Sequence, residues 1–364
     1  MKSLLFVGEF PQAGYTNGIR QSNSILHAEL TKLFHVCTVS ERPLTSNVSI
    51  VIKFFYAVSD VFRVLYGIVM STLSQRSRFH LSYHVLSCSL FGLIKSSFIA
   101  SLFWCVSRYR FIHVHRVDIT ASPSFFVSFL KSILIKYIFS LSTRVISLSG
   151  RHKASLIRHA PAANIKVLRN TLAPELESRL LSLDPCARGR SRFLYLSNLF
   201  KQKGVFDFLS LFSEFFPEHL SNCLIAGSSV DANVSRSLEE SRIALYGSLT
   251  DCAKRKFFAM GRCLIFPSYI EAQPITLLEC MCAGLPFIAY DVGLCREISP
   301  PDYPYIIAPG INNLANAFGR FLAGDDESTH SCSLALRKTY LRFHSSEVYS
   351  RSVASIFLES CFNI

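Results

Sequence analysis

The first half of the chain has few acidic residues. Between Val61 and Arg169 there is one, Asp118, against 15 lysines and arginines, and residues 1–190 hold 23 basic against 8 acidic side chains. Residues 191–364 hold 15 basic and 17 acidic ones, so the excess behind the formal charge of +13 lies in the first half. Such a surface attracts nucleic acid or an anionic membrane. Apolar residues between the charges favour the membrane. A nucleic-acid partner is disfavoured, because the sequence has neither an arginine-rich run nor a recognisable nucleic-acid-binding module. The alternative is a basic surface with no specific partner.

Paired cysteine motifs and uninterrupted apolar spans are also missing. The 12 cysteines are scattered, and Cys280 and Cys282 make one close pair without a second, which is a poor zinc signal. We expect small core residues in a reducing compartment, Cys105 included. The most apolar stretch, residues 85–106, carries Lys95 at its centre, where a charge is costly in a bilayer. It therefore predicts a helix and strand of a folded domain, on a side that could face a membrane. The first ten residues are too short for a signal-peptide core and predict a buried strand.

Short apolar runs alternate with helical patterns along most of the chain. Half of the residues are hydrophobic, which excludes a disordered chain. The alternation is typical of parallel sheets whose strands are joined by helices. The pattern breaks at residues 171–190, so we predict two parallel-sheet domains, residues 1–175 and 191–344, and a final helix in residues 345–364. The predicted strands are residues 3–7, 35–39, 110–114 and 144–148 in the first domain and 192–196, 222–226, 243–246, 263–266 and 286–289 in the second.

Residues 266–293, FPSYIEAQPITLLECMCAGLPFIAYDVG, place two glutamates among apolar neighbours. We expect Glu271 in the loop at the carboxyl end of a strand and Glu279 in the following helix, which ends at Gly284. Ligands of open parallel sheets bind at that edge, and carboxylates accept hydrogen bonds from the adjacent hydroxyls of a sugar or ribose. The pattern therefore predicts a polyol site. The alternative is a surface loop residue followed by an ordinary helical glutamate.

Two further loops carry residues suited to binding an anion. Lys203 and Gly204 end the segment YLSNLFKQKG, which follows the first predicted strand of the second domain. Gly14 and Gly18 lie between a predicted strand and helix, where glycine permits close approach and helix amides can bind an anion. That loop lacks the G-x-G-x-x-G fingerprint, which disfavours NAD. The alternatives are a solvated lysine and a plain turn.

The segment FIHVHRVD, residues 111–118, contains two histidines. His113 and His115 lie two apart on a predicted strand and so share a face, with His115 at its end, where we expect it to reach a ligand. Zinc would need further ligands, and the sequence shows no convergent set. The alternative for both is a hydrogen-bonded core histidine.

Pro267-Ser268, the two glutamates eight apart, Gly284-Leu285-Pro286 and Asp291-Val292-Gly293 together resemble the donor-binding signature of the retaining glycosyltransferases of family 4. The resemblance implies the GT-B fold: two Rossmann-like parallel-sheet α/β domains that face each other across a cleft, with the last helix, residues 345–364, crossing back to the first domain. It implies that Glu271 contacts the donor sugar, Glu279 the ribose and Lys203 the diphosphate. Two positions depart from the pattern: Ala272 replaces a frequent Gly, and Asn198 replaces a frequent Arg, for which Lys201 is a candidate substitute. The implied catalytic residues are His115 and Glu271, and the implied donor-binding residues are Gly14, Gly18, Asn198, Lys203, Glu271, Ala272, Gln273, Pro274, Ile275 and Glu279.

The resemblance also implies an activity. A hexosyltransferase of this type moves a sugar, with retention, from a nucleotide-sugar donor to a glycan or lipid-linked acceptor. We expect no metal or other cofactor, because nothing resembles an Asp-x-Asp site. The basic, aromatic first domain predicts a cytoplasmic enzyme, peripheral at the inner face of the cell membrane, in bacterial O-antigen, lipopolysaccharide, capsule or exopolysaccharide biosynthesis, with no nucleic-acid partner. The alternatives are a sugar phosphorylase or nucleotide-sugar epimerase of the same fold, and a non-catalytic sugar-nucleotide-binding subunit.

Overall fold

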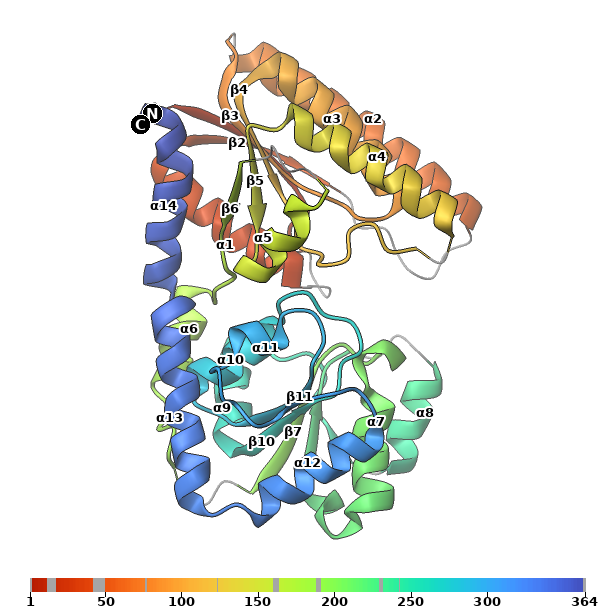
Figure 1. Ribbon diagram of the computed structural model, residues 1–364, viewed down its shortest axis with the longest axis vertical. Coiled ribbons are helices and arrows are strands. Elements are labelled where there is room, and N and C mark those ends of the chain that lie inside the picture. Colours follow the sequence, from red (N-terminus) through yellow and green to blue (C-terminus); the bar gives the residue numbers. More distant parts are fainter. Residues whose placement is uncertain are drawn as a thin grey trace. The chain divides into compact units, whose positions relative to one another are not determined.

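The chain folds into two compact units. One consists of residues 1–169 together with 349–364, and the other of residues 170–348 (Figure 1). The division lies after Arg169 rather than after residue 175, because Asn170 belongs to the second unit: its backbone N–H donates to Gln273 Oε1 (2.6 Å), and its carbonyl lies 3.0 Å from Nδ1 of His344. The computed structural model describes residues 2–11, 18–41, 50–75, 77–122, 124–159, 164–187, 191–228, 232–241 and 243–362.

The first unit is a six-stranded parallel sheet of order β2-β1-β3-β4-β5-β6. Helices α2, α3 and α4 pack on one face, where Leu5 and Val7 of β1 contact Val64 and Ile99. The strands are β1 (Ser3–Gly8), β2 (His35–Ser40), β3 (Phe79–Val85), β4 (Ser107–His113), β5 (Arg144–Ser147) and β6 (Ile165–Val167), and the helices are α1 (Gly18–Leu33), α2 (Ile50–Gln75), α3 (Leu90–Val106), α4 (Phe125–Leu141) and α5 (Gly150–Ile157).

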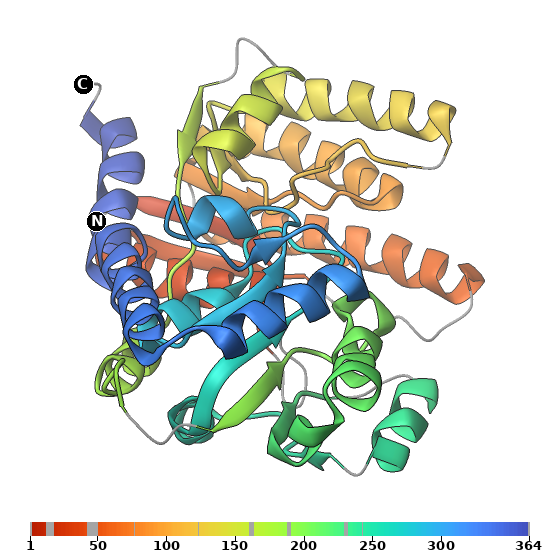
Figure 2. The same cartoon turned by 60° about the horizontal axis from the view of Figure 1, so that its bottom comes forward.

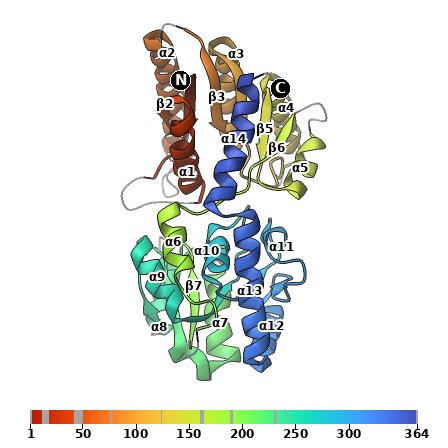
Figure 3. The same cartoon turned by 90° about the vertical axis from the view of Figure 1, so that its left-hand side faces the viewer.

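The opposite face of this sheet is covered in part by the last helix, α14 (Ser346–Phe362) (Figure 3). Its Phe357 ring lies 4.9 Å from that of Phe111, and Glu359 forms ion pairs with Arg144 (3.0 Å) and Lys166 (3.1 Å). Arg144 also donates to the carbonyl of Ile356. From Tyr349 onward this helix is therefore part of the first unit.

The second unit is also a six-stranded parallel sheet, of order β12-β11-β10-β7-β8-β9. Successive residues of β7 alternate between two cores: Leu194 and Leu196 face one, and Phe193 and Tyr195 the other. The strands are β7 (Arg192–Leu196), β8 (Cys223–Ala226), β9 (Ala244–Leu245), β10 (Gly261–Phe266), β11 (Phe287–Tyr290) and β12 (Ile306–Ile307), and the helices are α6 (Pro174–Leu181), η1 (Lys201–Lys203), α7 (Val205–Ser210), η2 (Leu211–Phe215), η3 (Pro217–Asn222), α8 (Ala232–Ser241), α9 (Asp251–Met260), α10 (Ile275–Ala283), α11 (Cys295–Ile298), α12 (Ile311–Ala323) and α13 (Asp326–Phe343).

All nine predicted strands exist, with ends shifted by up to three residues, but β3 and the two short edge strands β6 and β12 were not among them. The sequence of β3, FHLSYHV, alternates apolar and polar residues, although it lies between β1 and β4 and is buried. Ser82 and His84 are tolerated because they are paired. Ser82 Oγ lies 2.8 Å from Ser107 Oγ, and His84 Nε2 lies 2.9 Å from Ser96 Oγ. The cysteine prediction was wrong at Cys105, which is exposed on α3, whereas Cys280 and Cys282 are buried and free.

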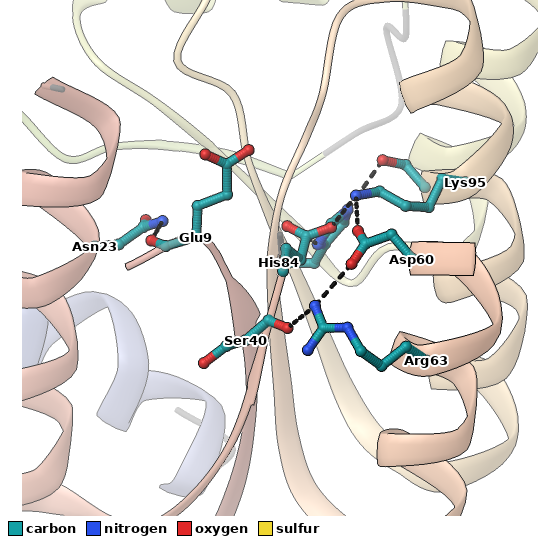
Figure 4. Close-up of polar contacts among 9 residues, drawn as sticks. Glu9, Asn23, Ser40, Asp60, Arg63, His84 and Lys95 are labelled. Atoms are coloured by element: carbon teal, nitrogen blue, oxygen red, sulfur yellow. Dashed lines mark hydrogen bonds and ion pairs between the residues drawn. The ribbon is translucent and has the colours of Figure 1, made fainter. Parts of the chain in front are cut away.

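Lys95 belongs to a network of charged side chains at the carboxyl edge of the first sheet (Figure 4). Its ammonium lies 2.5 Å from Glu41, which follows β2, and 3.2 Å from Asp60 of α2. Arg63 donates to Asp60 (2.7 Å) and to the carbonyl of Ser40 (2.6 Å). Burial lowers the pKa of Lys95, but the two carboxylates outweigh it and hold that pKa above its ordinary value. No helix in the described ranges is long and apolar enough to cross a membrane.

We expect Lys95→Ala to destabilise the first unit by about 3 kcal/mol, because the largely buried Glu41 and Asp60 lose their shared ammonium. Urea unfolding followed by the fluorescence of Trp104, the one tryptophan of the sequence, measures this. Lys136→Ala, at an exposed position of α4, is the control. Equal losses in the two variants would show that the network does not hold the unit together.

Candidate functional site

The loops after β7, β10 and β11 meet at the carboxyl edge of the second sheet, because neighbouring parallel strands end on the same side. Gly204 follows η1 with φ +73°, and a Cβ there would lie 1.9 Å from the carbonyl oxygen of Pro267. Gly293 has φ +60°, and its Cβ would lie 2.4 Å from the carbonyl oxygen of Glu271. Both positions need glycine, for conformation and for space. The three loops are thus packed directly against one another.

Lys203 and Glu271 form an ion pair at this edge. The ammonium lies 2.7 Å from Glu271 Oε1 and donates to the carbonyl of Ile270 at 3.1 Å. Tyr195, from β7, donates its phenol proton to the carbonyl of Lys203 (2.9 Å), which fixes the turn that carries the lysine. The Lys203 side chain is 27% exposed and that of Glu271 10%. A cation and an anion are therefore both presented at the edge of the sheet.

Glu279 is paired with a different lysine. It lies in α10, its side chain is 2% exposed, and its Oε1 accepts a hydrogen bond of 2.6 Å from Lys254 of α9. Burial lowers the pKa of Lys254, but the carboxylate of Glu279 outweighs it, so the pKa stands above its ordinary value. The buried carboxylate thus has a cationic partner inside the protein, which removes the cost of burying it alone.

Lys254 was not identified from the sequence, although a signal exists. It lies three and four residues before Phe257 and Phe258, both buried, so helical spacing places it on the inward side of α9. Lys256, two residues on, is exposed. The spacing indicates which lysine is buried, but it does not reveal that Glu279 is the partner.

The remaining predicted donor-binding residues of the second unit differ in exposure and in hydrogen bonding. Asn198 follows β7, where its Oδ1 accepts a long hydrogen bond from Ser228 (3.5 Å), and Lys201 is exposed in η1. The carbonyl of Ala272 accepts from the N–H of Leu294 (2.8 Å). Gln273 is buried and bonded to Asn170, which indicates a structural role. Pro274 and Ile275 are the N-cap and first residue of α10, beside the amides at the helix start.

The predicted residues of the first unit lie at the carboxyl ends of other strands. Gly14 is outside the described residues, and Gly18 is exposed as the first residue of α1. His115 follows β4 and is 5% exposed, and its ring centroid lies 4.1 Å from that of His113. His113 Nδ1 lies 2.7 Å from the hydroxyl of Tyr83. Burial, and then the neighbouring His152, lower the pKa of His115 to about 3, so its imidazole is neutral at physiological pH.

Residues 187–339 match the profile of the family described as Glycosyl transferases group 1, which is less than half of the chain. Sucrose-phosphate synthase from Thermosynechococcus elongatus superposes with a TM-score of 0.76 at 14% identity, covering 100% of each chain. The fold is GT-B. HepE from Anabaena, in complex with UDP, has a TM-score of 0.66 at 15% identity over 100% of each chain. The lipopolysaccharide outer core galactosyltransferase WaaB has a TM-score of 0.63 at 16% identity over 99% of each.

No curated protein matches the sequence significantly. The group 1 match covers the segment that contains Lys203, Glu271 and Glu279, and the GT-B fold covers both units. Together they support a glycosyltransferase of the GT-B fold.

We expect His115 to make the stability of the first unit depend on pH. Its pKa is about 3 in the folded protein and has its ordinary value, about 6.5, in the unfolded chain, so the unfolded state takes up the proton first as pH falls. Stability is lost below pH 6.5, by about 2 kcal/mol at pH 5 from this residue. Urea unfolding at pH 7 and pH 5, followed by Trp104 fluorescence, measures this. Between the two pH values His115→Gln should lose less unfolding free energy than the wild type. His35→Gln, at an exposed position, should keep the full pH dependence; identical curves for all three proteins would refute the assignment.

Proposed function

We propose that the protein is a retaining glycosyltransferase that moves a sugar from a nucleotide-sugar donor to a glycan or lipid-linked acceptor. The observation that carries this is the Lys203–Glu271 ion pair at the carboxyl edge of the second sheet, inside the segment that matches the group 1 family. A cation that stabilises a departing diphosphate and a carboxylate that accepts sugar hydroxyl protons are the two groups such a donor requires.

Lys203 is suited to the diphosphate. An ammonium has three N–H donors, and among the described residues two of them have partners, Glu271 and the carbonyl of Ile270. The third can donate to a phosphate oxygen without breaking the ion pair. The amides at the start of α10, which follows Glu271 in the chain, add positive potential. These groups stabilise the developing negative charge, and we propose that no metal is required.

Glu271 and Glu279 are suited to hydroxyl groups. Each carboxylate uses Oε1 for a lysine, and the second oxygen can accept a hydrogen bond from a hydroxyl. We assign Glu271 to the donor sugar and Glu279 to the ribose. Because Lys203 holds Glu271, its carboxylate is a poor nucleophile, and we propose that the acceptor attacks from the side of the leaving group, whose phosphate takes the proton. His115, being neutral, can orient a hydroxyl but is not a strong acid.

The acceptor side is inferred from the first unit. Its excess of basic residues and the apolar residues between them support an anionic membrane surface as a partner, with a lipid-linked acceptor at the inner face of the cell membrane. We propose a role in assembling a bacterial surface polysaccharide, such as O-antigen, lipopolysaccharide or capsule. The similar fold of WaaB, which acts on the lipopolysaccharide outer core, supports this direction.

We expect Lys203→Ala to weaken donor binding about 10- to 100-fold, because one charge-assisted hydrogen bond to the diphosphate is lost, and Glu279→Ala to abolish transfer. Calorimetric titration with the donor and a transfer assay measure the two effects, and thermal melting checks that both variants fold. Lys256→Ala, which removes an exposed lysine of α9, is the matched control for charge. Wild-type transfer by both site variants would remove the assignment.

A comparison of nucleotides identifies the donor class. HepE has been solved with UDP and with UDP-glucose, so UDP sugars are the first donors to test. A ligand that binds the native state at 100 times its Kd adds about 2.7 kcal/mol of stability, so the melting temperature should rise with one of UDP, GDP, ADP or CMP and its sugars. Lys203→Ala should reduce that rise. If a donor binds but is never turned over with any acceptor, the protein is a binding subunit, as the departures at Asn198 and Ala272 would allow. If sugar phosphate or epimerised donor forms without an acceptor, the protein is a phosphorylase or an epimerase.

A further inference from the structure

Helices α2, α3 and α4 are apolar on both sides. Their inner sides are core: Val64 and Ile68 of α2, Ile99 of α3 and Ile135 of α4 are at most 1% exposed. A helix on a protein surface normally carries polar residues on its outer side, and a helix that is apolar all round is normally buried all round. We therefore expect the outer sides of these helices to be covered by a second apolar environment.

The outer sides carry large hydrophobic residues on all three helices, which lie next to one another (Figures 1 and 2). Phe62 of α2 is 69% exposed, Phe98 of α3 56% and Phe126 of α4 70%. Single exposed hydrophobic residues are ordinary, whereas many of them gathered on neighbouring helices mark an interaction surface. We call it the outer helix face; it consists of Val58, Phe62, Tyr66, Val69, Met70, Leu73, Phe91, Ile94, Phe98, Trp104, Phe125, Phe126, Phe129, Ile133 and Tyr137.

The charge around the outer helix face identifies what covers it. Lys136 of α4 is exposed, as are Arg78 after α2 and Arg108 after α3, and the sequence from Val61 to Arg169 contains a single acid, Asp118. A second copy of this chain would bring two surfaces with the same excess of positive charge together. An anionic lipid surface offers both the apolar interior and the opposite charge.

We propose that the outer helix face docks on an anionic lipid monolayer, with α2, α3 and α4 lying in the plane of the interface. This deepens the membrane part of the proposed function and does not depend on sugar transfer. The helices do not span: α3 and α4 have 17 residues each, about 25 Å at 1.5 Å per residue, whereas the hydrocarbon core is about 30 Å thick. Helix α2 is longer, with 26 residues, but it carries the charged pair Asp60 and Arg63. Their inner sides are occupied by the sheet, and Lys95 is held by Glu41 and Asp60.

Trp104 gives this inference a direct readout, because it is the one tryptophan of the sequence and is 60% exposed on α3. It lies three residues after Ser101, whose hydroxyl is 2.8 Å from that of Tyr137 of α4, so it points toward the α4 side of the outer helix face. Vesicles of phosphatidylcholine with phosphatidylglycerol should shift its emission to shorter wavelength. Lipids brominated on their acyl chains should quench it, without any donor present.

The triple variant Phe62→Ser, Phe98→Ser and Phe126→Ser should bind these vesicles at least ~100-fold more weakly, because three large apolar side chains no longer enter the lipid. The substituted residues are exposed, so thermal melting should be unchanged. Leu334→Ser with Leu341→Ser, at exposed positions of α13 in the second unit, is the matched control and should bind like wild type. Binding should fall with added salt and be weak on pure phosphatidylcholine.

Three outcomes would overturn the inference. If the protein sediments with the vesicles but brominated lipids do not quench Trp104, the protein contacts the lipid through another surface. Absence of binding to anionic vesicles would remove the lipid partner. A dimer that protects Trp104 from acrylamide in the absence of lipid would assign the outer helix face to a second copy of the chain. None of these results bears on Lys203, Glu271 or Glu279, whose role is decided by donor binding and transfer.

Discussion

The ion pair between Lys203 and Glu271 is the contact around which the carboxyl edge of the second sheet is arranged. It joins the loop after β7 to the loop after β10, and each side is held by further contacts: the Tyr195 phenol holds the Lys203 backbone, and Gly293 lets the next loop lie on Glu271. Charged groups fixed in this way need little reorganisation when a charged ligand arrives, and preorganisation of this kind stabilises charge that develops during a reaction.

Buried lysines paired with carboxylates recur in both units and explain how so apolar a chain carries charge inside. Lys95 is shared by Glu41 and Asp60 in the first unit, and Lys254 is held by Glu279 in the second. In each case removal of one partner leaves an uncompensated charge, so these pairs fix the relative positions of the helices and loops that carry them more firmly than exposed pairs do. The difference between them is accessibility. The Lys203–Glu271 pair is the more exposed, which suits it to meet a ligand.

The sequence predicted the sheets better than the contacts. Apolar runs located nine strands, because strands buried on both faces lack polar residues, and β3 escaped since its Ser82 and His84 are buried with partners more than ten residues away in the chain. Glu271, Glu279 and Lys203 were predicted as site residues from their spacing and from the family resemblance. The pattern of residues along the chain does not show which lysine each glutamate contacts, nor that Gln273 accepts a hydrogen bond from Asn170. These contacts depend on how loops distant in the sequence meet. The same holds for the low pKa of His115, which comes from burial beside other histidines.

The return of α14 to the first unit constrains the order in which the protein matures. Tyr83 and Phe111 belong to central strands near the start of the chain, yet the ring that covers them, Phe357, is translated more than 240 residues later, after the whole second unit. While a ribosome makes the intervening segment, the part of the first sheet that α14 covers stays exposed, and its closure is a late, long-range event. A nascent chain from which Phe357 has not yet emerged therefore exposes aromatic surface on Tyr83 and Phe111, and surface of this kind is prone to aggregation.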